Sequence, residues 1–257
     1  MRSWLPLVFL LLASPLMISG AHADDATETA APTVKELLEK MDANLVFDMR
    51  TATIAMSVDK GKRTKEYKML SYSRGGDQAA IEFAEPVRDE GTKLLKKGTD
   101  LWMYLPNIDR TQRISGHLLR QGLMGSDFSY EDMMENNRFA ETYDGEIQGV
   151  VEHEGSTCWK LELKARDPEI SYPRREVLLD QATFMPLRQD LYAKSGVKLK
   201  VWTMSDIKEL QGRQTAMKMT ARDLVTNNST TTLTFSDVQY SVQIADEIFS
   251  NRWLERR

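Results

Sequence analysis

Apolar and polar residues alternate along most of this chain, and this pattern constrains its fold more than any other feature of the sequence. A period of two places successive side chains on opposite faces of a β-strand. The first such segment runs from Thr51 to Val58, with Ala52, Ile54 and Met56 on one face. Short turns join many of the segments, which predicts a long antiparallel meander rather than βαβ units. Further alternating segments lie at residues 65–72, 79–84, 93–96, 101–105, 110–114, 146–152, 157–165, 176–180, 187–192, 197–204, 215–224 and 230–235.

A helix is expected before the first strand. Thr33 and Glu36 have the spacing of a capping box, in which the two side chains satisfy free amides of the first turn. Apolar residues then recur at helical intervals, which predicts an amphipathic helix with one face available to cover a sheet. These residues are Val34, Leu37, Leu38, Met41 and Leu45.

Residues 115–137 interrupt the strands, because they are rich in Gly, Met and acidic residues. We expect a short helix here, with Asp127 or Ser129 as its cap and acidic residues near its N-terminus. An alternative, which we consider weaker, is a hydrolase site built from Asp127, Glu131 and Asp132.

Basic residues precede these acidic residues at Arg110, Arg113 and Arg120. Their guanidinium groups either bind a phosphate or carboxylate headgroup or pair with the acidic residues that follow. The sequence leaves both interpretations open.

The N-terminus has the pattern of an export signal. Arg2 precedes an apolar run from Trp4 to Ile18, and Ala21-His22-Ala23 forms a small-x-small cleavage site. No Cys follows the site, so we expect cleavage after Ala23 without lipidation. This predicts a signal peptide at residues 1–23, a flexible leader at 24–32 and a single domain at 33–257.

Several classes of chemistry lack support in the sequence. The formal net charge of −4 gives no electrostatic case for nucleic acid. We find no HExxH, GxSxG or GxxxxGKS motif, and we predict no metal, no cofactor and no enzymatic activity. Cys158, the one cysteine, is buried, paired with a second chain, or reactive, and we favour an inert buried thiol.

Methionine is unusually frequent on the predicted strands, where Val, Ile and aromatic residues are more typical. Methionine is flexible and adapts to variable apolar partners, so it suits a ligand cavity, although it also fills gaps in a packed core. Residues 101–106 are apolar on both faces, which indicates that other elements cover both faces of this strand or that one face lines a cavity. The candidate cavity residues are Met69, Trp102, Tyr104, Met204 and Met217.

Three segments give the chain a resemblance to the LolA-like outer-membrane lipoprotein-sorting proteins. They are Leu101-Trp-Met-Tyr-Leu-Pro106, Arg113-Ile-Ser-Gly116 and Gly125-Ser-Asp-Phe-Ser-Tyr-Glu-Asp132. The likeness extends over essentially the whole chain after the signal peptide. The motif residues, for which we predict a structural or gating role, are Arg113, Ser126, Asp127, Phe128, Ser129, Tyr130, Glu131 and Asp132.

The resemblance implies a mainly β fold with some α (α+β). Its core is an incomplete antiparallel β-barrel, or half-barrel, whose apolar concave face is covered by helices. It also implies a periplasmic carrier that shields the acyl chains of a lipoprotein or other lipid on the way to the outer membrane. The expected partners are those acyl chains and an inner-membrane transporter, and the expected state is a monomer. The alternative is a non-catalytic envelope scaffold that docks to such a transporter.

Overall fold

The computed structural model describes residues 31–135, 137–225 and 229–256. The signal peptide expected at residues 1–23 and the leader residues up to 30 lie outside the described residues. No helix in the described ranges is long and apolar enough to cross a membrane.

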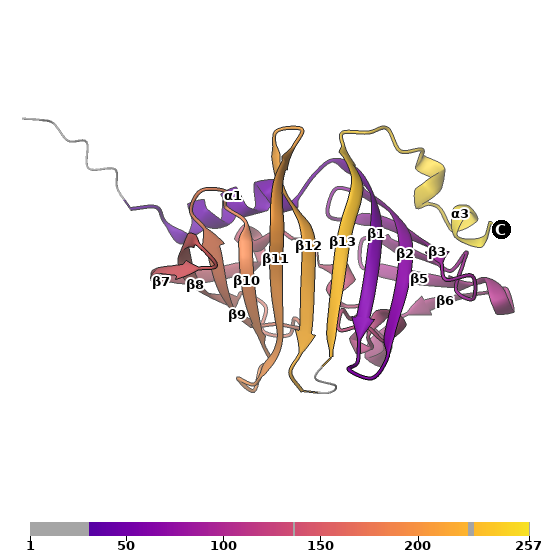
Figure 1. Cartoon of the computed structure of the whole chain (residues 1–257), viewed down its shortest axis with the longest axis horizontal. Coiled ribbons are helices and arrows are strands. Elements are labelled where there is room, and N and C mark those ends of the chain that lie inside the picture. The colour runs from indigo at the N-terminus through magenta and orange to yellow at the C-terminus, as the bar shows by residue number, and fades with distance from the viewer. Residues whose placement is uncertain (1–30, 136, 226–228, 257) are drawn as a thin grey trace, which may run out of the picture. The chain divides into compact units, whose positions relative to one another are not determined.

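One antiparallel sheet of 13 strands dominates the structure (Figure 1). Every segment whose alternation predicts a strand forms one, so the antiparallel meander is confirmed. The strands are β1 (Met49–Asp59), β2 (Thr64–Arg74), β3 (Gln78–Glu85), β4 (Lys93–Lys97), β5 (Asp100–Leu105), β6 (Arg110–Ile114), β7 (Tyr143–His153), β8 (Ser156–Ala165), β9 (Arg174–Asp180), β10 (Pro186–Tyr192), β11 (Lys198–Leu210), β12 (Arg213–Asp223) and β13 (Thr230–Tyr240).

The order of the strands shows that the sheet consists of two meanders. It runs β6-β5-β4-β3-β2-β1-β13-β12-β11-β10-β9-β8-β7, so β1 and β13 join the halves, and β6 and β7 are the edges. The sheet is therefore not closed. Residues 115–142, which we call the central segment, connect the strand at one edge to the strand at the other.

Few helices accompany the sheet. The predicted N-terminal helix is confirmed as α1 (Val34–Leu45), and Thr33 and Glu36 form its capping box. After Ser129, where we expect a short helix, the structure forms the 3-10 turn η4 (Asp132–Met134). The other helices are α2 (Phe139–Thr142), α3 (Asn251–Glu255) and the 3-10 turns η1 (Pro106–Ile108), η2 (Gly116–Arg120), η3 (Leu123–Gly125) and η5 (Asp246–Phe249).

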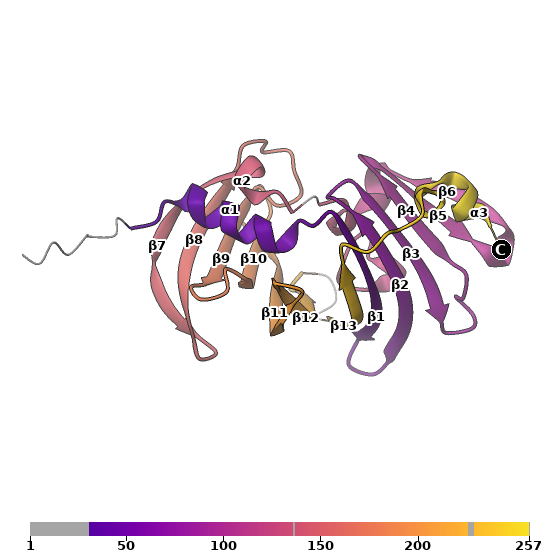
Figure 2. The ribbon, with the colours of Figure 1, turned by 90° about the horizontal axis from the view of Figure 1, so that it is seen from above.

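One face of the sheet packs against α1, α2 and the central segment. Figure 2 shows α1 and α2 above the half formed by β7 to β10. There Leu37, Leu38 and Met41 of α1 join a buried cluster with residues of β8 and β9. Over β1 to β6, Leu123 and Tyr130 of the central segment complete a second cluster with inward residues of those strands.

The opposite face of β2 to β5 is covered by the C-terminal residues. Phe249, Trp253 and Leu254 pack with Leu95 and Tyr104 in a separate cluster. The residues of β5 therefore alternate between two cores, which explains why both of its faces are apolar.

Candidate functional site

The face covered by the central segment contains a cavity of about 270 Å³. Its walls come from β1, β2, β3, β10, β11, β12 and β13, and α1 and the central segment, which includes α2, contribute its cover. Most of the lining residues are apolar. A neighbouring space of about 230 Å³ shares Phe47, Arg50, Ile54 and Phe235 with it and adds residues of β2, β3 and β4, so the hollow continues across the sheet from β1 towards β4.

Methionine is the commonest apolar residue in the wall. Its unbranched, polarizable side chain adapts to apolar partners of different shape. The lining methionines are Met56, Met69, Met133, Met185, Met204 and Met219.

Asp127 fixes the central segment to the first residues of β13. Its carboxylate accepts hydrogen bonds from the hydroxyls of Ser229 and Thr231, while the Thr231 hydroxyl also accepts from the Asp127 amide at 2.9 Å. Next to it, the Phe128 ring lies 5.8 Å from the ring of Trp202 and reaches the cavity wall. Asp127 is therefore an anchor and not the helix cap that we considered from the sequence.

Asp132 makes a second attachment, further along the same half of the sheet, at β11 and at Tyr172 before β9. Lys200 Nζ donates to its Oδ2 at 2.7 Å, and the Tyr172 hydroxyl donates to its Oδ1 at 2.6 Å. The Ser129 hydroxyl accepts from the Asp132 amide at the start of η4, and the Ser129 amide donates to Asp132 Oδ2. Ser129 and Asp132 thus bond each other reciprocally, but the N-cap residue of η4 is Glu131, without a side-chain cap, so the cap expected at Ser129 does not form. Asp132 holds the motif onto β11.

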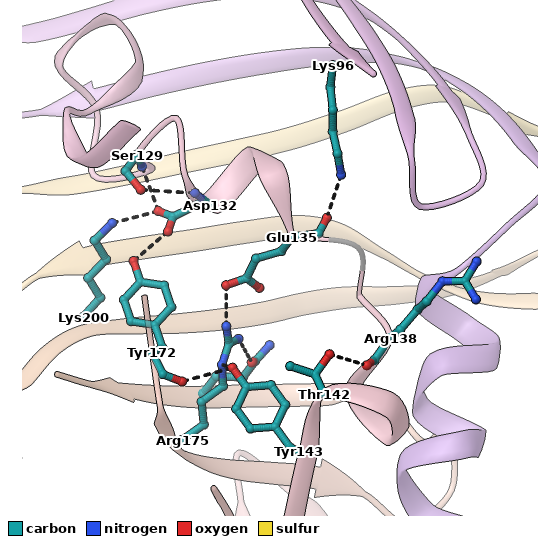
Figure 3. A network of polar contacts seen from close by, with 11 residues as sticks. Lys96, Ser129, Asp132, Glu135, Arg138, Thr142, Tyr143, Tyr172, Arg175 and Lys200 are labelled. Carbon is teal, nitrogen blue, oxygen red and sulfur yellow. Dashed lines mark hydrogen bonds and ion pairs between the residues drawn. The ribbon is translucent and has the colours of Figure 1, made fainter. Parts of the chain in front are cut away.

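Arg175 is the centre of the polar network in Figure 3. This guanidinium is 2% exposed and donates to Glu135, to the Tyr143 hydroxyl at 2.7 Å and to Gln189 at 3.1 Å. Aromatic rings, including that of Trp202, surround it. Because a buried charge is costly without partners, this set of contacts holds Glu135 against the sheet.

Burial raises the pKa of Glu135, and the nearby positive charge of Arg175 acts in the opposite direction. Burial also raises the pKa of Tyr143 to about 12, so its hydroxyl remains protonated and available as a donor at neutral pH. On the other side of the segment, Lys96 donates to the carbonyls of Met134 and Glu135 at 3.0 and 3.3 Å. Residues 132–135 are therefore tied to both halves of the sheet.

Two donors in the cavity wall lack acceptors. Arg50 Nε and Trp202 Nε1 are buried, and neither has a hydrogen-bond partner among the described residues. The Arg50 guanidinium lies 4.5 Å from the centre of the Phe47 ring.

The five candidate cavity residues do not all line the cavity. Met69 and Met204 line the cavity, whereas Met217 is not among its lining residues. Trp102 and Tyr104 lie on the opposite face of β5, in the cluster with the C-terminal residues. The role of these five side chains in binding a ligand stays a prediction.

Arg113 is paired with Asp100, which lies on the neighbouring strand β5, at the end away from the β5–β6 turn. The pairing of the basic residues with Asp127 and Asp132 that we considered is wrong, because hydroxyls and Lys200 take those two carboxylates. The short separation in sequence favoured the arginines, whereas the fold brings distant strands to the motif.

Sequence reasoning missed Arg50, Tyr172, Arg175 and Lys200. A signal was present for Arg175, because it has the same parity along its strand as Val177 and Leu179, both fully buried. A charged residue in phase with an apolar face indicates a buried ion pair.

Comparisons with known proteins agree with this fold. A family model described as "uncharacterized protein" matches residues 75–256. No curated protein matches the chain. Three solved structures cover most of it. A DUF1329 family protein from Desulfovibrio piger has 25% identity and a TM-score of 0.78, and the match covers 86% of this chain and 97% of that one.

A domain from Vibrio parahaemolyticus, named as an outer membrane lipoprotein-sorting protein, has 26% identity and a TM-score of 0.76, with coverage of 86% and 98%. A LolA superfamily protein from Nitrosomonas europaea has 24% identity and a TM-score of 0.73, with coverage of 87% and 100%. These structures confirm the resemblance to LolA-like proteins and the open antiparallel sheet.

Proposed function

The chain belongs to the family whose model matches residues 75–256, and we propose that it acts as a periplasmic carrier of acyl chains. The observation that carries this proposal is the methionine-lined cavity between the sheet and the central segment. The name of the Vibrio parahaemolyticus domain, a lipoprotein-sorting protein, supports the same class of cargo. The carrier would hold the acyl chains of a lipoprotein or another lipid during transfer towards the outer membrane.

The physical need for such a carrier follows from the cost of exposing a lipid to water. Each CH₂ group of an acyl chain contributes about 0.8 kcal/mol to burial in an apolar environment. A cavity wall of flexible methionine side chains offers that environment to chains of different length. The sequence contains no P-loop motif, so loading would depend on a partner, which we propose to be an inner-membrane transporter.

Release requires the cavity to open. The central segment is attached through polar groups, Asp127 and Asp132 among them, and through apolar contacts of Leu123 and Tyr130, rather than through strand pairing. Such a cover can separate from the sheet without unpairing β-strands. We therefore propose that movement of the central segment gives the cargo access to the cavity.

We propose that the carrier reaches the periplasm through the N-terminal signal, with cleavage after Ala23 and no lipid attached. N-terminal sequencing of the exported protein tests this point, and we expect Asp24 as the first residue. A stable membrane-anchored product that retains Met1 would contradict it.

Native mass spectrometry of the exported protein, followed by lipid extraction, tests the carrier proposal. We expect one copy of the chain with bound mass that dissociates on activation and contains acyl chains. Protein that is free of lipid and instead co-purifies with an envelope protein would favour a scaffold. Hydrolysis of an envelope substrate that is lost in Asp127→Asn or Asp132→Asn would favour an enzyme.

A further inference from the structure

Arg50 stands out among the cavity residues because its charge has no carboxylate partner. It lies on β1, between Ser73 of β2 and Tyr240 of β13, and lines the cavity. No carboxylate of the described residues forms an ion pair with it. Instead, the guanidinium packs on two aromatic rings. Its carbon lies 4.5 Å from the centre of the Phe47 ring and 5.7 Å from the centre of the Phe235 ring.

The carboxylates of the cavity wall are already engaged elsewhere. Asp132 is held by Lys200, and Glu135 is held by Arg175. Among the lining residues that the structure describes, Arg50 therefore contributes the positive charge that nothing in the wall balances. Burial lowers the pKa of Arg50, and Tyr240 is the titratable neighbour that acts on it. A guanidinium nevertheless keeps its charge at neutral pH.

The hydrogen-bonding groups of the cavity wall also favour a ligand that carries acceptor atoms. Arg50 Nε and Trp202 Nε1 are both donors, and both lack acceptors among the described residues. Trp202 is in register with Val58, at the other end of β1, so it is a separate donor, and a ligand that satisfies Arg50 must supply an acceptor atom at the Arg50 end of the cavity. For a desolvated guanidinium, a carboxylate or phosphate group is the acceptor that binds most strongly, because the hydrogen bonds are charge-assisted.

The apolar wall extends from Arg50 along the same strand. Ile54 and Met56 line the cavity further along β1, and six residues of a strand span about 20 Å. A ligand with an anionic group at Arg50 would therefore place its hydrocarbon chain over these residues.

We propose that Arg50 is the headgroup subsite of the cavity, and that the cargo is an amphiphile with a carboxylate or phosphate group. This inference rests on the proposed function, since it assigns a headgroup class to the acyl ligand of the same cavity.

Displacement of a pyrene-labelled acyl probe with an uncharged end tests the inference. The competitors are dodecanoate, dodecyl phosphate and dodecanol, which share one chain length, together with acetate and inorganic phosphate, which have no chain. We expect the anionic amphiphiles to displace the probe at concentrations about tenfold lower than dodecanol, as hydrogen bonds to a charged group allow. Acetate and inorganic phosphate should fail to displace it, because both parts of the ligand contribute.

In Arg50→Gln, the concentrations of dodecanoate, dodecyl phosphate and dodecanol that displace the probe should differ by no more than about twofold. Arg74→Gln is the matched control, since Arg74 also stacks on a ring, that of Phe249, and has a buried Nε without an acceptor, but does not line the cavity. It should keep the anionic preference of the wild type. Circular dichroism of both variants checks that they fold, and Arg50→Lys, which retains the charge, should restore part of the preference.

Equal displacement by dodecanol and dodecanoate in the wild type would overturn the headgroup subsite but leave the carrier proposal intact. A preference that survives in Arg50→Gln would overturn the role of Arg50. Displacement by acetate or inorganic phosphate alone would overturn the amphiphile and indicate a site for a free anion. Failure of the acyl probe itself to bind would instead contradict the proposed function.

Discussion

At the scale of single residues, Asp127 shows how the motif is held in place. It is 4% exposed, and its partners are two hydroxyls from the start of β13. Replacing a buried carboxylate leaves these donors with a poorer acceptor, and the cost of such a change is about 1–3 kcal/mol. Asp127→Asn should therefore lower the free energy of unfolding by about that amount in urea denaturation. Glu209→Gln, at an exposed position of β11, is the control for loss of one negative charge and should have little effect.

A stability of Asp127→Asn equal to that of the wild type would show that the carboxylate is dispensable as an anchor. We expect no catalytic activity that depends on this residue.

Cys158 provides a second test at this scale. The structure places it in β8 as a free and fully buried thiol, one of the alternatives that the sequence left open. Burial raises its pKa to about 11, and Asp180 and Glu152 act in the same direction. Because the thiolate is the reactive form, a thiol reagent should modify the folded protein far more slowly at neutral pH than the unfolded protein. Rapid, stoichiometric labelling of the folded chain would contradict this assignment.

At the scale of elements, the buried ion pair between Arg175 and Glu135 is one of the attachments that hold the central segment. Glu135→Gln removes the negative partner of Arg175, whose guanidinium is 2% exposed. Breaking a buried pair in this way costs about 3–5 kcal/mol, because a buried charge remains without compensation. We expect faster amide hydrogen exchange in residues 123–135. The measurement is hydrogen exchange with mass spectrometry, compared with the wild type.

Glu169→Gln is the matched control for this prediction. The Glu169–Lys194 pair is exposed on both sides, so its loss should have little measurable effect. Equal exchange in the two variants would show that the buried pair does not hold the segment.

The strands and α1 could be predicted from the sequence because their signals are local. A period of two and a capping box require only the neighbouring residues, and each of these predictions is confirmed. The path of the central segment could not be predicted in this way. Asp132 meets Lys200 and Asp127 meets Thr231 only because β6 and β7 are opposite edges of one sheet.

The faces of β5 were ambiguous for the same reason. Met103 and Tyr104 are both buried, and alternation alone does not say which of the two cores adjoins the cavity. The C-terminal residues, far away in sequence, decide this by covering Tyr104. The candidates Trp102 and Tyr104 therefore lie away from the cavity, whereas Met69 and Met204 line it.

At the scale of the whole compact unit, Pro32–Arg257, the sheet has a different cover on each face, and we assign the two covers different roles. The C-terminal residues form a packed core, in which Trp253 is 6% exposed. Trp253→Ala should therefore lower the free energy of unfolding by about 3–5 kcal/mol, as for other buried aromatic residues. It should leave the affinity for an acyl probe unchanged under conditions in which the variant is folded. A large loss of affinity in the folded variant would contradict this assignment, because it would indicate that the probe binds on the face covered by the C-terminal residues.

The central claim is that the space beside Met204 receives an acyl chain. The measurement is the affinity of a fluorescent fatty-acyl probe for the wild type, for Met204→Trp and for Lys218→Trp, with the free energy of unfolding of each. Lys218 is exposed on β12, so Lys218→Trp adds the same ring outside the cavity. We predict that Met204→Trp folds and binds the probe at least about tenfold more weakly, a change of about 1.4 kcal/mol, while Lys218→Trp binds like the wild type. Unfolding of Met204→Trp together with no binding of the probe by the wild type would show a packed core and contradict the carrier account.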